Sequence, residues 1–283
     1  MSRSITGATM VAGVVGHPVR HSVSPILHNA WLEAAGIDGV YVAFATPKVG
    51  FARFVEGLRG GAVRGLNVTI PFKEEALALA DRASERARMA GAANLLVFED
   101  DGTIVADNTD GLGLLGAFAE QAPAFAVADA TVAMLGAGGA ARGAAAALIL
   151  AGAAEVRLVN RTVERARGVA AELGGQVRAF GWDERDEALA GAQALINATS
   201  LGLEGGEPLE IDLAALPKGA PVMDMVYRPL RTPLLEQAKA AGRPTVDGLA
   251  MLIGQAVPSF EALFGARPPA IDVRGLAIAA LGL

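Results

Sequence analysis

The sequence contains no cysteine, few aromatic residues and no excess of basic charge. Without cysteine it can form no disulfide framework, thiolate zinc site or cysteine nucleophile, and we expect it to work in the reducing cytoplasm. Its 24 Lys and Arg against 30 Asp and Glu give a formal charge of −6, which disfavours nucleic acid and anionic membranes as partners. The histidines predict no metal site, because Pro18 prevents a regular helix from presenting His17 with His21.

Long apolar runs are also missing. The most apolar stretch, residues 143–154, is mostly alanine and falls short of the roughly 20 residues that a membrane-spanning helix needs. Residues 8–16 lack the small-residue cleavage pattern of a signal peptide. We therefore expect a soluble protein. Hydrophobic residues still make up 52% of the 283, which predicts real cores and suits two domains of ordinary size.

The first part of the chain alternates strand and helix patterns. Strands are predicted over residues 9–15, 40–45 and 65–70, helices over residues 24–35, 51–59 and 72–80, and a hairpin over residues 92–99 and 102–106. We expect Ser24 to cap the first helix, with Pro25 at its first position.

A second unit begins near Gly111 and repeats the pattern. Strands are predicted over residues 131–135, 156–160, 194–198 and 222–225, with helices over residues 141–151 and 162–172. The β-α-β alternation predicts a parallel sheet with helices on both faces. We expect an α/β protein with domains at residues 1–110 and 111–248, the first completed by C-terminal helices over residues 249–283.

A glycine-rich turn follows the first strand of the second unit. Gly136, Ala137, Gly138, Gly139, Ala140 and Ala141 match the pattern G-x-G-x-x-G/A between a strand and a helix. In a Rossmann-type fold these glycines let the backbone approach a pyrophosphate at the helix N-terminus. The alternative is a tight turn in a chain rich in alanine and glycine.

The end of the next strand indicates which dinucleotide binds. NAD-binding proteins usually place an acidic residue there, whereas this chain has Asn160, Arg161 and Thr162, followed by Arg165 and Arg167. A guanidinium at this place can pair with a 2′-phosphate, so we expect NADP(H) as cofactor. A solvated helix face is the alternative interpretation of these arginines.

Three polar clusters in the first unit suggest a substrate site. Ser22 and Ser24 precede a helix whose free amides can help to hold an anion, although capping alone would explain Ser24. Asn67 and Thr69 share one face of a predicted strand by the period of two. Asn94 lies in a third cluster, together with Asp110.

Lys73 and Asp110 are the candidates for proton transfer. Lys73 falls in the first turn of a helix, where the dipole disfavours a cation, and this suits an acid/base group better than a stabilising surface charge. A solvated lysine is the alternative. Asp110 suits the N-cap of the next helix, and a carboxylate that also faced Lys73 would orient its amine.

Together these motifs resemble the shikimate dehydrogenase family over nearly the whole chain. The segments that carry the resemblance are Gly16–Pro18, His21–Pro25, Asn67–Lys73, Gly91–Asn94, Asn108–Gly111, Gly136–Ala140, Asn160–Thr162, Asn197–Ser200, Asp224–Tyr227, Asp247–Gly248 and Gln255. The resemblance implies reversible reduction of 3-dehydroshikimate to shikimate by NADPH in aromatic amino-acid (chorismate) biosynthesis. It also implies two α/β domains about a cleft, an N-terminal substrate domain and a C-terminal Rossmann domain.

The resemblance further implies roles for individual residues. Ser22 and Ser24 would hold the substrate carboxylate, and Asn67, Thr69, Asn94 and Asp110 would bind ring hydroxyls. Lys73 would transfer the proton with Asp110 as its partner, while Tyr227 and Gln255 would close on the substrate. Glu85, Thr199, Met225 and Gly248 would lie near the cofactor.

Two departures and two alternatives remain. Leu95 stands where the family commonly has Thr, and Ser24 stands where quinate-using relatives tend to carry Thr, which favours shikimate. A quinate/shikimate or aminoshikimate dehydrogenase is one alternative. A nucleotide-sensing protein without catalysis is the other, and the presence of both Lys73 and Asp110 argues against it. The sequence leaves open whether the protein is a monomer or a homodimer.

Overall fold

The computed structural model describes residues 5–282, which form two compact units. Unit 1 comprises residues 5–109 and 255–282, and unit 2 comprises residues 110–254. The sequence suggested boundaries after residues 110 and 248, whereas the contacts divide the chain after Thr109 and Gly254. Of the helices in the described residues, none is long and apolar enough to cross a membrane.

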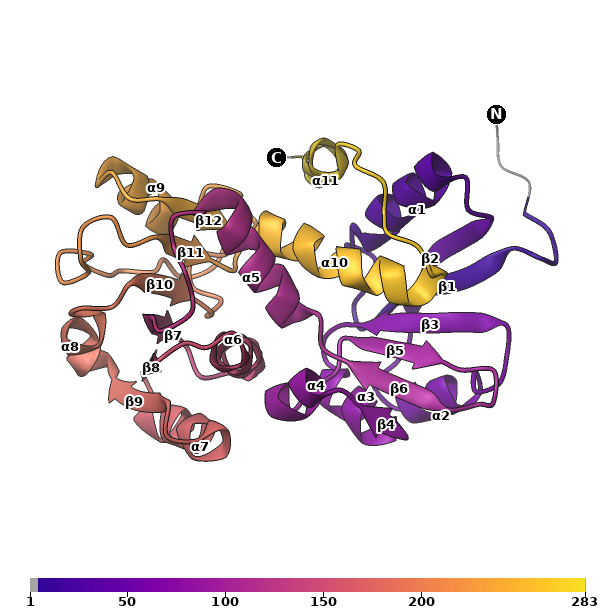
Figure 1. The fold of residues 1–283 in the computed structure, drawn as a ribbon, viewed down its shortest axis with the longest axis horizontal. Coiled ribbons are helices and arrows are strands. Elements are labelled where there is room, and N and C mark those ends of the chain that lie inside the picture. The colour runs from indigo at the N-terminus through magenta and orange to yellow at the C-terminus, as the bar shows by residue number, and fades with distance from the viewer. Residues whose placement is uncertain (1–4, 283) are drawn as a thin grey trace. The chain divides into compact units, whose positions relative to one another are not determined.

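Unit 1 contains a mixed six-stranded sheet (Figure 1). Its strands are β1 (Met10–Gly16), β2 (Gly39–Ala45), β3 (Val63–Val68), β4 (Arg82–Ala83), β5 (Leu95–Phe98) and β6 (Ile104–Asp107), in the order β2-β1-β3-β5-β6-β4. β1 is parallel to both β2 and β3, and β5 is antiparallel to β3 and β6. The predicted hairpin is therefore present as β5 and β6.

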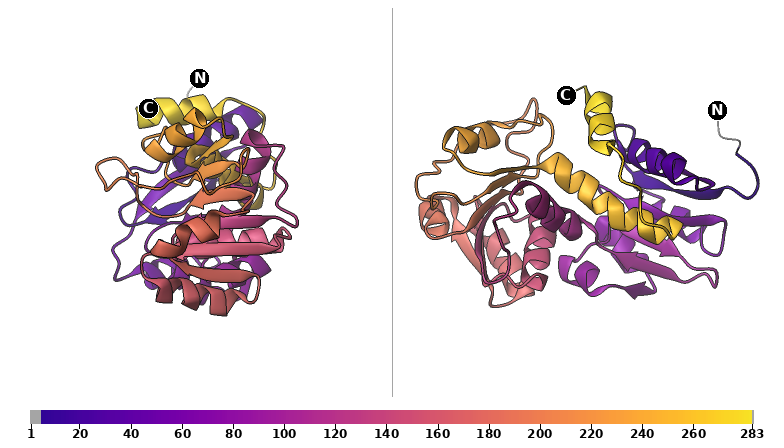
Figure 2. Two further views of the ribbon diagram at one scale, coloured as in Figure 1. Left: turned by 90° about the vertical axis from the view of Figure 1, so that its left-hand side faces the viewer. Right: turned by 45° about the horizontal axis from the view of Figure 1, so that its top comes forward.

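Helices cover both faces of this sheet. They are α1 (Ser24–Ala35), α2 (Phe51–Glu56), α3 (Lys73–Leu79), α4 (Glu85–Ala90), the second part of α10 (Gly248–Phe264) and α11 (Val273–Leu281). α2 and α3 pack on one face, where the rings of Phe51 and Phe72 stack 4.4 Å apart over Leu66. α1 and α10 lie on the other face, and α11 lies beside α1 (Figures 1 and 2).

An aromatic cluster joins α1, β2 and α10 on that second face. The imidazole of His28 stacks on the ring of Tyr41, with centroids 4.0 Å apart, and its edge contacts Trp31. Phe260 of α10 packs against both His28 and Trp31. His28 is fully buried, and neither ring nitrogen has a hydrogen-bond partner in the described structure. Burial lowers the pKa of His28 from 6.5 to about 3.

Unit 2 contains a second six-stranded sheet, with the order β12-β11-β10-β7-β8-β9. The strands are β7 (Thr131–Leu135), β8 (Glu155–Asn160), β9 (Val177–Gly181), β10 (Ala194–Asn197), β11 (Val222–Asp224) and β12 (Thr245–Asp247), and each pair is parallel. The order reverses between β7 and β10, where doubly wound sheets bind their ligands beyond the carboxyl ends of the strands.

The helices of unit 2 build a core on each face of its sheet. They are α5 (Asp110–Gln121), α6 (Gly139–Leu150), α7 (Val163–Leu173), α8 (Arg185–Leu189), α9 (Pro233–Ala240) and the start of α10. Ala141, Ala144 and Ala145 of α6 belong to one core, and Leu189 and Leu234 belong to the other. The predicted doubly wound α/β class is confirmed. The sequence patterns missed β4, β9, β12, α4, α8 and α9, most of which are short.

Two local expectations in unit 1 were wrong. Val23, not Ser24, precedes α1, and its backbone has helical angles instead of the extended ones that a side-chain cap needs. Ser24 is itself the first helical residue. β3 ends at Val68, two residues before the end predicted from the sequence, although the N–H of Thr69 still donates to Val15 O of β1 at 2.9 Å. Thr69 instead begins a turn in which its carbonyl accepts the N–H of Phe72.

The buried His28 makes the stability of the protein depend on pH. Because the pKa is about 3 in the folded state and near 6.5 in the unfolded chain, the unfolded state gains a proton first as the pH falls. The contribution of His28 to the free energy of unfolding is complete above pH 6.5 and falls by about 1.4 kcal/mol per pH unit toward pH 3. Urea unfolding over this range checks the slope. His28→Gln should flatten it, whereas His17→Gln, at an exposed position, should leave it unchanged.

Candidate functional site

Four chain segments meet at one edge of the unit 1 sheet. β1, β3 and β6 end there, and β5, which is antiparallel to β3 and β6, begins there. The segments after β1, β3 and β6 and the residue before β5 therefore lie close together. Together with the last residues of β3, they carry most of the polar residues of this unit singled out from the sequence, including Ser22, Asn67 and Asn94.

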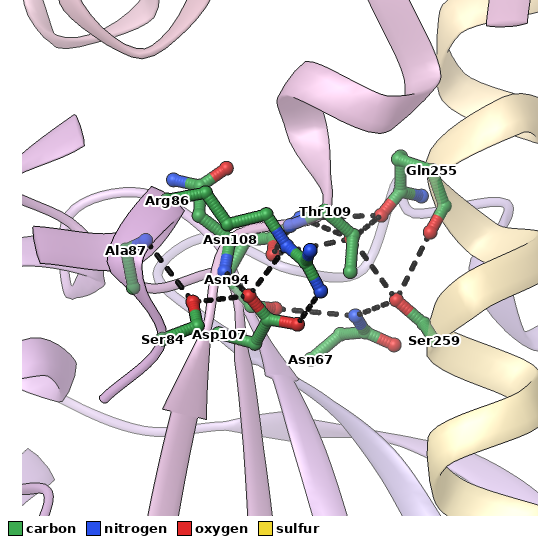
Figure 3. Close-up of polar contacts among 10 residues, drawn as sticks. All are labelled: Asn67, Ser84, Arg86, Ala87, Asn94, Asp107, Asn108, Thr109, Gln255 and Ser259. Carbon is green, nitrogen blue, oxygen red and sulfur yellow. Dashed lines mark hydrogen bonds and ion pairs between the residues drawn. The ribbon is translucent and has the colours of Figure 1, made fainter. Parts of the chain in front are cut away.

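Amide and hydroxyl side chains form a buried network at this edge (Figure 3). Asn67 Nδ2 donates to Asn94 O at 3.1 Å and to Ser259 Oγ at 2.9 Å, and Tyr41 Oη donates to Asn67 Oδ1 at 2.8 Å. Ser259 comes from α10 and donates to the carbonyl of Gln255 one turn earlier. Burial raises the pKa of Tyr41 well above its ordinary value, so its hydroxyl stays protonated.

The side chain of Asn94 extends the network to the segment after β6. The N–H of Thr109 donates to Asn94 Oδ1 at 2.7 Å, and Asn94 Nδ2 donates to Thr109 Oγ1 at 2.9 Å and to Gln255 Oε1 at 3.3 Å. Asn67, Asn94 and Gln255 are at most 9% exposed. The predicted residues Asn67, Asn94 and Gln255 are thus brought together in unit 1.

An ion pair holds the chain just before Thr109. Arg86 of α4 makes a two-point contact with Asp107, with Nε–Oδ1 at 2.8 Å and Nη2–Oδ2 at 2.6 Å (Figure 3). Ser84 also donates to Asp107 Oδ1 and caps α4 by accepting the N–H of Ala87. These contacts fix the end of β6 and hence the position of Thr109.

The remaining substrate candidates of unit 1 lie on its neighbouring segments. Ser22 Oγ accepts the N–H of Ser24, the first residue of α1, at 3.3 Å. Thr69 lies so close to β1 that a Cβ at Gly16 would come within 2.4 Å of Thr69 Cγ2. Lys73 begins α3, and its carbonyl accepts the N–H of Ala93 at 2.8 Å, beside Asn94.

The glycine-rich turn of unit 2 has the geometry that a pyrophosphate needs. Gly136 has φ +109°, and a Cβ there would press on Ala198 and Thr199. A Cβ at Gly138 or Gly139 would instead enter open space, so a ligand can approach this backbone closely. α6 begins at Gly139, and Gly138 has no side chain to cap its amides. The turn therefore fits the phosphates of a dinucleotide.

Exposed arginines follow the neighbouring strand. Asn160 Nδ2 donates to the carbonyl of Thr162 and shapes the turn, while Arg161 and Arg165 are exposed. Arg161 lines a cavity of about 580 Å³, together with Trp182, Arg185, Leu201, Glu207, Pro208, Glu210, Ile211, Asp212 and Gln237. Its Nη1 lies 3.9 Å from Glu207 Oε2. A guanidinium in this place can bind a phosphate at the 2′ position of an adenosine ribose.

A buried carboxylate supports the other cofactor candidates of unit 2. Asp224 accepts hydrogen bonds from Asn197 Nδ2 at 2.9 Å, the N–H of Val226 at 3.0 Å and Thr232 Oγ1 at 2.6 Å. Asn197 in turn accepts both the N–H and the hydroxyl of Thr199. Burial raises the pKa of Asp224, although these hydrogen bonds act in the opposite direction. Asp224 thus holds the turns that carry Thr199 and Met225.

Gly248 and Tyr227 lie near the same turn. A Cβ at Gly248 would come within 2.4 Å of Met225 O, so α10 can begin there only with glycine. Tyr227 is half-buried, and burial raises the pKa of its phenol. Two candidate residues belong to a different unit from the groups that they are expected to contact, which are the cofactor for Glu85 and Lys73 for Asp110. Glu85 is an exposed residue of unit 1, and Asp110 is the first residue of α5 in unit 2.

Sequence reasoning missed several residues of these networks. Ser259 follows Gln255 by four residues, a helical spacing that could have identified it. Tyr41 gave no such signal, because its partner Asn67 is 26 positions away, and Thr232 gave none because it lies eight positions from Asp224 with no helix or strand joining them. Among the described residues, no group of three or more His, Asp or Glu side chains could hold a metal ion.

Comparison with known proteins gives matches along the whole chain. Residues 14–96 match the model of the shikimate dehydrogenase substrate-binding domain, and residues 118–202 match that of shikimate/quinate 5-dehydrogenase. A curated relative from Caulobacter vibrioides, shikimate dehydrogenase (NADP(+)), is 61% identical over 283 residues, which cover 100% of this chain and 99% of the relative.

Solved structures agree with these matches. Shikimate 5-dehydrogenase from Thermus thermophilus, in complex with NADP(H) and shikimate, is 36% identical with a TM-score of 0.83, covering 96% of this chain and 98% of that one. Quinate dehydrogenase from Corynebacterium glutamicum, in complex with NAD, is 28% identical with a TM-score of 0.86, covering 97% and 99%.

Asp224→Ala should destabilise unit 2 strongly. The substitution removes the acceptor of three hydrogen bonds from buried positions, and we expect the free energy of unfolding to fall by about 3 kcal/mol. Urea unfolding measures the loss. Asp183→Ala, at an exposed carboxylate of the same unit, should change stability by less than about 0.5 kcal/mol. Equal losses in the two variants would contradict the role given to Asp224.

Proposed function

The chain belongs to the shikimate dehydrogenase family, and we propose from this membership that it catalyses the reversible reduction of 3-dehydroshikimate to shikimate by NADPH. This reaction is a step in the biosynthesis of chorismate and the aromatic amino acids. The buried network of Asn67, Asn94 and Gln255 is the observation that carries the proposal, because a polyhydroxylated substrate needs such side chains.

Unit 1 supplies most of the proposed substrate contacts. Ser22 and Ser24, at the start of α1, hold the carboxylate of the substrate. The ring hydroxyls bind to Asn67, Thr69, Asn94 and Asp110, and Gln255 and Tyr227 complete the contacts. The meeting of the segments that bear Ser22, Asn67 and Asn94 at one sheet edge supports these assignments.

Lys73 is the proposed proton-transfer residue. NADP(H), when bound, supplies or accepts the hydride at the reacting carbon, so the protein moves one proton and positions the substrate. In the direction of oxidation, the Lys73 amine takes the proton of the reacting hydroxyl. In reduction, its ammonium returns a proton to the new oxygen. Asp110 orients the Lys73 amine.

Unit 2 binds the cofactor in this proposal. The amides of residues 136–140 hold the pyrophosphate, and Arg161 and Arg165 pair with the 2′-phosphate, with Asn160 and Thr162 shaping the turn between them. Thr199, Met225 and Gly248 lie near the nicotinamide, and Glu85 contacts the cofactor from unit 1. The open backbone at Gly138 and Gly139 supports the first assignment.

The proposed enzyme works in the cytoplasm as a monomer or homodimer. The lack of cysteine supports the reducing compartment. The acidic net charge supports small molecules, and not nucleic acid, as its partners.

Initial rates with shikimate or quinate, and with NADP⁺ or NAD⁺, test the function directly. We expect fast reduction of the nicotinamide only with shikimate and NADP⁺. Arg161→Ala should raise the KM for NADP⁺ about 10- to 100-fold, because a charge-assisted contact to the 2′-phosphate is lost, and leave the KM for NAD⁺ unchanged. Turnover that prefers quinate or NAD⁺ would favour the quinate/shikimate alternative. Cofactor binding without turnover would favour the sensor.

Lys73→Ala should lower kcat about 10²- to 10⁴-fold because the proton acceptor is removed. The KM for NADP⁺ should change little. Lys48→Ala, at an exposed lysine of the same unit, is the matched control and should retain the rate. A Lys73→Ala enzyme with unchanged kcat would exclude Lys73 as the proton-transfer residue.

A further inference from the structure

The hydrogen bonds around Asn67 determine which part of a ligand this residue can recognise. Both hydrogens of Nδ2 are used, by Asn94 O and by Ser259 Oγ. Tyr41 Oη occupies one of the two acceptor positions on Oδ1. Among the described residues, the second acceptor position on Oδ1 is therefore the polar site that Asn67 keeps for a ligand.

The side-chain amide of Asn67 cannot rotate by 180° without losing these hydrogen bonds. A rotation by 180° would place Oδ1 against the carbonyl oxygen of Asn94, which has no hydrogen to give. It would also face Ser259 Oγ, whose hydrogen is directed to Gln255 O at 3.0 Å. Since Oδ1 can only accept, the shared hydrogen at Tyr41 must come from the phenol.

Tyr41 is itself held in place by packing. Its side chain is 1% exposed, and the His28 ring stacks on it with an angle of 6° between the planes. Ser259 sits on α10 next to Phe260, which packs against the same His28. The aromatic cluster therefore holds in place both Tyr41 and Ser259, the two residues whose hydroxyls contact the Asn67 carboxamide.

We propose that Tyr41 and Ser259 are positioning residues that lock Asn67 as a hydrogen-bond acceptor only, so that it binds a ring hydroxyl that the reaction does not oxidise. This inference rests on the proposed function. An acceptor repels a carboxylate, and it also repels the reacting oxygen, which is a carbonyl in the oxidised substrate. A hydroxyl that keeps its hydrogen in both reaction directions is the group that fits.

Substrate analogues test whether Asn67 acts only as a hydrogen-bond acceptor. Shikimate is compared with two analogues in which one of its two non-reacting hydroxyls is replaced by fluorine, which cannot donate a hydrogen bond. With saturating NADP⁺, the wild type should lose about 10- to 100-fold in kcat/KM with one of the analogues. In Tyr41→Phe/Ser259→Ala this loss should shrink about tenfold, because Asn94 O alone then holds the amide, which can offer its N–H to the ligand. The KM for NADP⁺ should stay unchanged.

A control variant and the two single variants complete the test. Val55→Ala removes buried side-chain atoms from the core on the other face of the unit 1 sheet, and it should keep the full discrimination. If the double variant does not fold, each single variant should lose about threefold of the discrimination. Undiminished discrimination in the folded variants, or a wild type that accepts both analogues as well as shikimate, would overturn the proposal. A wild type that does not oxidise shikimate at all would instead contradict the proposed function.

Discussion

The need to satisfy buried amide groups is the constraint on which the candidate site depends. Asn67, Asn94 and Gln255 are almost completely buried, and an unpaired amide in such a place would cost about 1–3 kcal/mol for each group. Each is therefore fixed by partners from other segments, namely Tyr41 on β2, Thr109 after β6 and Ser259 on α10. The same bonds that stabilise unit 1 give these side chains one orientation, so little conformational entropy remains to be lost when a substrate binds.

The topology of each sheet explains why these residues can meet. In unit 1 the antiparallel hairpin of β5 and β6 returns the chain to the edge where β1 and β3 end, and this places Asn94 and Thr109 beside Asn67. In unit 2 all strands are parallel, and the turns after β7, β8, β10 and β11 lie at one edge by the same rule. The buried Asp224 joins the last two of these turns, as the hydrogen-bond network joins the segments of unit 1.

Much of this arrangement could be predicted from the sequence, because local patterns carry it. The glycines at 136 and 138 and the arginine at 161 lie within short motifs, and so do Asn67 and Lys73. The partners of these residues could not be predicted in the same way. Tyr41 meets Asn67 across 26 positions, and Ser259 meets it across 192, so only the folded chain reveals them. The expected cap at Ser24 failed because the first turn of α1 begins one residue earlier than Pro25 suggested.

A crystal structure of the protein with shikimate and NADP⁺ bound would test the central claim most directly. The account predicts a ring hydroxyl within hydrogen-bond distance of Asn67 Oδ1 and the substrate carboxylate at Ser22 and Ser24. It also predicts that Asn67 keeps its bonds to Tyr41, Asn94 and Ser259. A carboxylate or reacting oxygen at Asn67, or a rotated Asn67 amide that donates to the substrate, would contradict it.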